Sequence, residues 1–69
     1  MSGETPQARR NERIGELVSL GLAALEADVI ASIEAGESQV SIAERRGVSK
    51  QTINKAKRRG VNQLAGVKG

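Results

Sequence analysis

The side chains best suited to chemistry are amides and cations in the second half of the chain. If residues 50–59 form a helix with Ile53 facing inward, Gln51, Lys55 and Arg58 point nearly the opposite way, with Asn54 on one flank. A carboxamide can donate and accept a hydrogen bond at once, and an ammonium donates to oxygen acceptors. The chain has no cysteine and no histidine, which excludes thiolate chemistry and imidazole acid–base catalysis. These residue types indicate binding, and we expect no enzyme activity, no metal and no cofactor.

Charge is distributed unevenly along the chain. The net charge is +3, but residues 1–42 carry three basic and seven acidic side chains, whereas residues 43–69 carry eight basic side chains and one acidic one, Glu44. A basic segment of this kind favours an anionic partner, which is a nucleic acid, a membrane surface or an acidic protein. The charge alone does not choose among them.

The elements that position this segment are predicted to be helices. Apolar residues recur at steps of three and four, the period of an amphipathic helix, at Ile14, Val18, Leu22, Leu25, Val29 and Ile33. Thr5 and Pro6 fit a helix start as N-cap and first helical residue. Residues 6–35 form either one long helix or two helices broken near Gly21, and we favour two because glycine costs about 1 kcal/mol in a helix interior. The apolar stripe serves either an intramolecular core or a dimer.

Glycine and serine residues divide the rest of the chain. Gly36 fits a left-handed helix end, and Ser38 and Ser49 fit N-caps of helices over about 39–46 and 50–59, with a turn between them and an end at Gly60. We therefore expect an all-α domain of three to four helices at residues 6–60, after a disordered lead (1–5) and before a flexible tail (61–69).

The segment Q-V-S-I-A-E-R-R-G-V-S-K-Q-T-I-N-K-A-K-R-R, residues 39–59, resembles the helix-turn-helix family of bacterial and phage DNA-binding proteins. It covers about a third of the chain and is similar to motifs of repressors, transposition proteins and the promoter-reading domain of sigma factors. Ala43 supplies the small residue and Gly47 the turn residue of that pattern. The motif packing residues are Ile42, Ala43, Gly47, Val48, Ile53 and Ala56. The segment departs at Arg46, which stands where the family usually has an apolar residue; its stem can lie along apolar surface.

The resemblance implies that the helix over residues 50–59 enters the DNA major groove. The implied base-reading residues are Gln51, Thr52, Asn54 and Lys55. The implied phosphate-binding residues are Ser38, Gln39, Ser41, Arg45, Arg46, Ser49, Lys50, Arg58 and Arg59. Lys68, Arg9, Arg10 and Arg13 are candidate arms toward DNA, although Glu12 and Glu16 favour helical salt bridges for the three arginines.

We therefore expect sequence-specific binding of double-stranded DNA by a small transcriptional regulator of the repressor type. A single recognition helix reads few base pairs, which favours a homodimer through the N-terminal amphipathic helix. Without a secretory signal or an apolar span, the expected location is the cytoplasm, in association with the nucleoid. Two alternatives stay open: an architectural DNA-binding protein with little sequence preference, and a protein-interaction module such as an antitoxin.

Overall fold

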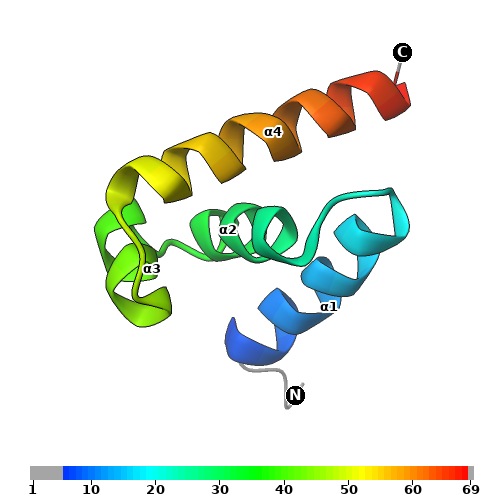
Figure 1. The fold of residues 1–69 in the computed structure, drawn as a ribbon. Coiled ribbons are helices and arrows are strands. Elements are labelled where there is room, and N and C mark those ends of the chain that lie inside the picture. The colour runs from blue at the N-terminus through cyan, green and yellow to red at the C-terminus, as the bar shows by residue number, and fades with distance from the viewer. Residues whose placement is uncertain (1–5, 69) are drawn as a thin grey trace.

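The computed structural model describes residues 6–68, and within this range the chain forms four α-helices and no strand (Figure 1). The helices are α1 (Pro6–Ser19), α2 (Ala24–Glu34), α3 (Gln39–Arg46) and α4 (Lys50–Lys68). The predicted all-α domain of three to four helices is confirmed, and so is the break near Gly21. The predicted lead and the Thr5 cap lie outside the described residues.

Glycines end the first three helices. Gly21, Gly36 and Gly47 have φ angles of +104°, +96° and +69°, a backbone region that side chains with a Cβ rarely adopt. After Gly36, the Glu37 N–H donates to the Ser32 carbonyl at 2.9 Å, and the same bond recurs after the other two glycines. These bonds satisfy carbonyls that a helix end would otherwise leave unpaired. The left-handed end predicted at Gly36 is therefore confirmed.

Serines begin the last two helices. The Ser38 Oγ accepts the Ser41 N–H at 3.1 Å, and the Ser49 Oγ accepts the Thr52 N–H at 3.1 Å. Both predicted N-caps are confirmed. The turn between α3 and α4 is therefore bounded by a positive-φ glycine on one side and a serine cap on the other.

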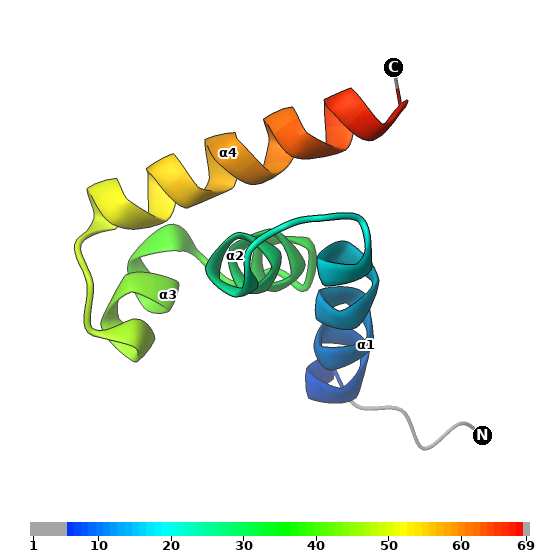
Figure 2. The same cartoon turned by 45° about the vertical axis from the view of Figure 1, so that its right-hand side comes forward.

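The helices are arranged around α2. Figures 1 and 2 show α1 and α3 on different sides of α2, with α4 running across α2 and α3. Two apolar clusters form the core. The first cluster consists of Leu17, Leu22, Ala27, Ile30 and Ala31, with Ile14 and Leu64 packed against it. The second cluster consists of Val29, Ile42, Ala43, Ile53 and Ala56, with Leu25 and Ile33 packed against it.

Most of the predicted apolar stripe is used within the chain. Leu22 and Val29 are buried in the clusters, and Ile14, Leu25 and Ile33 pack against them. Val18 is the exception, because 46% of it is exposed. The stripe therefore forms an intramolecular core. No helix within residues 6–68 combines the length and the apolar character needed to cross a membrane.

The end of α4 differs from the prediction. We expected the helix to end at Gly60 and a flexible tail to follow, but α4 continues to Lys68. Gly60 is buried against α2, where a Cβ would collide with Ile30. Leu64 packs on the first cluster, and Gln63 Nε2 donates to the Leu20 carbonyl at 3.4 Å. The glycine thus permits close helix packing, and the packing holds the next turns in helical form.

Candidate nucleic-acid interface

The junction of α3 and α4 is built mainly by the residues expected to pack there. Ile42 and Ala43 from α3 meet Ile53 and Ala56 from α4 in the second cluster. Val48 is the exception, since it is 38% exposed and lies outside the cluster. Its N–H bonds to the Ala43 carbonyl within the turn, and Val29 of α2 completes the cluster in its place.

Arg46, where the sequence departs from the pattern, forms an ion pair with α2. Its Nε donates to Asp28 Oδ2 at 2.6 Å, and Arg45 Nη1 donates to the same oxygen at 3.3 Å. The Asp28 side chain is only 5% exposed. Burial raises its pKa, but hydrogen bonds from Arg46, Arg45 and Ser32 outweigh burial and hold the pKa of Asp28 below its ordinary value. Ion pairs therefore hold α3 to α2 where an apolar contact is usual.

A second carboxylate, Glu37, engages the same side of α3. Arg45 Nη2 donates to Glu37 Oε1 at 3.1 Å, and the Ser41 hydroxyl donates to Oε2 at 2.9 Å. Arg10 of α1 lies 3.7 Å away from the same carboxylate. The hydrogen bond from Arg45 is the main cause that lowers the pKa of Glu37; burial opposes it and the bond from Ser41 adds to it.

Part of the expected phosphate-binding set already has partners within the protein. Ser41, Arg45 and Arg46 are directed at carboxylates of the protein itself, because α2 and the loop before α3 place Asp28 and Glu37 against them. The hydroxyls of Ser38 and Ser49 are used as caps, and Gln39 is half-buried.

Two of the N-terminal arginines, Arg10 and Arg13, form ion pairs with acidic residues. Arg13 lies 3.3 Å from Glu16, as expected for a helical salt bridge, and 3.0 Å from Glu34 of α2, which sequence spacing did not indicate. Arg10 lies beside Glu37, so two arginines of α1 contact acidic residues outside their own helix.

The described cations of α4, unlike the ion-paired arginines of α1 and α3, have no acidic partner. No acidic residue follows Glu44 in the sequence. Among the described side chains, no carboxylate forms an ion pair with five cations of α4: Lys50, Lys55, Lys57, Arg58 and Arg59. All but Lys57 are exposed. The helix therefore presents uncompensated positive charge.

The expected base-reading residues mostly face outward. Gln51, Asn54 and Lys55 are exposed on α4. Thr52 is half-buried, and its hydroxyl lies 3.0 Å from the Ser49 hydroxyl, so it contributes to the helix start and is less accessible than expected.

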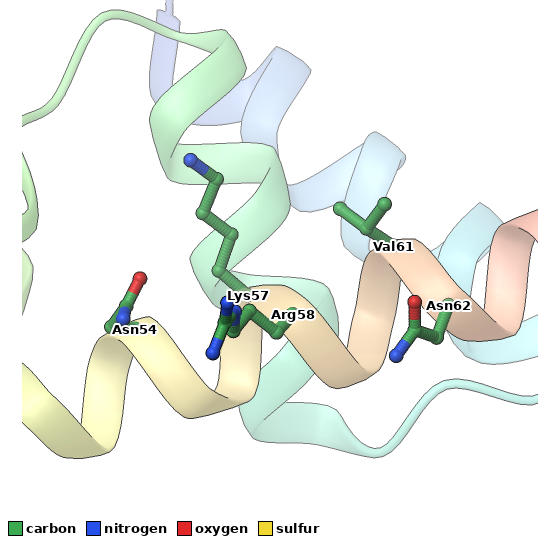
Figure 3. A pocket seen from close by; sticks show the side chains of 5 residues that line it. All are labelled: Asn54, Lys57, Arg58, Val61 and Asn62. Carbon is green, nitrogen blue, oxygen red and sulfur yellow. The ribbon is translucent and has the colours of Figure 1, made fainter.

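Two hollows lie along opposite flanks of α4. The first hollow, of about 540 Å³, is open, and Figure 3 shows the five α4 side chains that line it: Asn54, Lys57, Arg58, Val61 and Asn62. The second hollow, of about 210 Å³, lies between α4 and the start of α2, and its lining is Ala23, Leu25, Glu26, Thr52, Lys55, Ala56 and Arg59. On a helix of 100° per residue, a ridge through Gln51 and Asn62 separates the other residues of the first lining from the second lining.

Sequence reasoning missed Lys57, Val61 and Asn62 as part of this surface. The last two were assigned to a tail because the helix was expected to end at Gly60. One available signal was the spacing of four from Asn54 to Arg58 to Asn62, which continues one helical face past the glycine.

Within the described range no group of three or more acidic side chains is positioned to hold a metal ion. No protein-family profile, curated protein sequence or solved structure matches the chain.

Proposed function

We propose that this protein binds double-stranded DNA with α4 in the major groove and α3 supporting the start of α4. The observation that carries the proposal is the contrast in charge. Arg10 and Arg13 of α1 and both arginines of α3 are paired with carboxylates. Among the residues that the structure describes, five cations on α4 have no such partner, and they lie beside exposed amides. Uncompensated cations release counterions from DNA on binding and so supply affinity.

The dimensions of α4 fit this partner. A helix with its side chains is about 10–12 Å across, and the major groove of B-form DNA is about 12 Å wide. Gln51 and Asn54 can bond an adenine edge through both amide atoms, and Lys55 can donate to guanine. Lys50, Arg58 and Arg59 are proposed to contact phosphates.

The proposed role is a small, sequence-specific transcriptional regulator of the repressor type, located in the cytoplasm with the nucleoid. We propose that it acts as a homodimer, because one recognition helix reads only a few base pairs. Half-sites are then expected about 34 Å apart on a pseudo-palindrome. The exposed Val18 on α1 is a residue that a dimer contact through α1 would cover.

A second candidate is an architectural protein that binds DNA with little sequence preference. The observation that favours it is the number of unpaired cations on α4. Five such cations outnumber the two amides, Gln51 and Asn54, that are expected to read bases. Binding dominated by phosphate contacts depends steeply on salt and little on sequence.

The deciding experiment is selection of bound sites from random duplex DNA, followed by affinity measurements on the recovered and scrambled duplexes. A regulator yields an enriched palindrome, and Gln51→Ala is expected to cost about 1–3 kcal/mol on that site and to relax one base position. Equal affinity for scrambled duplexes would favour the architectural function. Absence of binding to any duplex at low salt would reject both.

A further inference from the structure

We infer that the two hollows beside α4 receive backbone phosphates from opposite strands of one DNA duplex, so that the helix bridges both strands. This inference depends on the proposed DNA binding, and it adds which cation meets which strand. It assigns Lys57 and Arg58 to one strand and Arg59 to the other. It also assigns Lys55 to a phosphate beside Arg59, in place of the guanine contact named above.

First, four cations of α4 lie in pairs beside the two hollows. Each hollow is lined by two α4 cations: Lys57 and Arg58 in the first, Lys55 and Arg59 in the second. None of the four forms an ion pair within residues 6–68. Each hollow therefore offers two charges to an anion without first breaking a contact of the protein.

The second step concerns the one carboxylate near these cations. Glu26 lines the second hollow, but its Oε1 accepts the Ala23 N–H at 3.1 Å. Its position is therefore set by the start of α2, and the hollow keeps a net positive charge from its two cations. The first hollow has no acidic lining residue.

The third step is the match between the helix and the groove. The two cation pairs sit on opposite flanks of one helix, which is about as wide as the major groove that separates the two phosphate backbones. The ridge between the flanks carries Gln51, which is exposed toward the position of the base edges. Double-stranded RNA is a poor fit, because its A-form major groove is too deep and narrow to admit side chains of a helix.

The test is a map of phosphate contacts on the selected duplex, in which single phosphates are replaced by neutral methylphosphonates on each strand in turn. For the wild-type protein, the substitutions that weaken binding are expected on both strands. Within each half-site, the variant K57Q/R58Q is expected to lose the sensitive positions of one strand, and K55Q/R59Q those of the other. In a dimer, the two-fold axis exchanges the two strands in the second half-site. Arg45→Gln removes an ion-paired cation and serves as the control. It is expected to keep the sensitive phosphate positions on both strands.

Salt dependence gives a second measurement that needs no specific site. Each double substitution is expected to reduce the slope of log affinity against log salt by about 1.8, and the two are expected to add. Glutamine is a good helix former at these positions, and circular dichroism would verify that the fold is kept. Sensitive phosphates on only one strand of each half-site, or both variants acting on the same strand of a half-site, would overturn the inference while leaving DNA binding intact. Failure of the wild-type protein to bind any duplex would instead reject the proposed function and this inference with it.

Discussion

The helices α3 and α4 carry cations of the same type but use them in different ways. Arg45 and Arg46 at the end of α3 hold that helix against α2 through Asp28 and Glu37. The helix α4 is held instead by apolar packing, with Gly60 allowing close approach, and its cations remain unpaired in the described structure. The difference separates cations that stabilise the fold from unpaired cations that remain available to an anionic ligand.

The largest expected effect comes from removing the unpaired charges. The variant K55Q/R58Q/R59Q is expected to weaken duplex binding by about 10²–10³-fold at low to moderate salt, since three phosphate contacts contribute a slope of about 2.7. Fluorescence anisotropy over a salt series measures both quantities. The matched control R45Q/R46Q also removes cations, but from residues that are already paired. An equal loss of salt slope in the two variants would break the distinction between α3 and α4.

The next effect tests how α3 is anchored. Asp28→Ala leaves Arg45 and Arg46 without their buried partner and is expected to lower the free energy of unfolding by about 1–3 kcal/mol. Both arginines are partly exposed and can reach water, so the loss lies below that of a fully buried pair. Urea denaturation measures the change. The freed arginines should also raise the salt slope of DNA binding, and an unchanged slope would argue that they never reach phosphates.

A related change tests how α4 is anchored. Gly60→Ala places a Cβ against Ile30 and is expected to cost about 1–2 kcal/mol by overpacking, after the gain in helix propensity is subtracted. Gly66→Ala is the matched control on the same helix, because a Cβ there meets no atom within 4 Å, and it should stabilise by up to about 1 kcal/mol. Thermal melts compare the two variants. Equal stabilisation by both would show that α4 does not pack closely at Gly60.

The smallest expected effect is on the pH dependence of stability. The pKa values of Asp28 and Glu37 are lowered in the folded state, so their contribution is present above the ordinary pKa of each group and is lost as the pH falls through the folded value. Melting temperatures measured from neutral pH down to strongly acidic pH should therefore fall less steeply for Asp28→Asn than for the wild type. Each ion pair is partly exposed and is expected to contribute about 0.2–1 kcal/mol. Parallel curves of melting temperature against pH for the two proteins would show that the pKa of Asp28 does not change on folding.

Local features of the fold could be predicted from the sequence because their causes are local. A glycine with positive φ and a serine cap act within a few residues, so the ends of the helices at Gly36 and the starts after Ser38 and Ser49 were visible in the chain. The packing residues of the α3–α4 junction, Val48 excepted, were implied by the resemblance to the helix-turn-helix pattern.

What could not be predicted depends on residues far apart in the chain. The pairing of Arg46 with Asp28 joins positions 18 residues apart and requires knowing how α2 lies against α3. Gly60 is ambiguous in a sequence, since glycine both ends helices and permits close packing, and only the position of Ile30 decides between the two. Because the helix was expected to end at Gly60, the outward-facing residues of α4 beyond Arg59 were not predicted.

The continuous course of α4 has a consequence for how the molecule opens. Ile53 and Ala56 belong to the second cluster, and Leu64 packs on the first, so one helix is shared by both halves of the core. Local unfolding of either half must therefore disturb the backbone hydrogen bonds of this helix. Amide protons between residues 53 and 64 should exchange with solvent most slowly, at the rate of global unfolding. The surface proposed to bind DNA would then persist or disappear as a single cooperative unit.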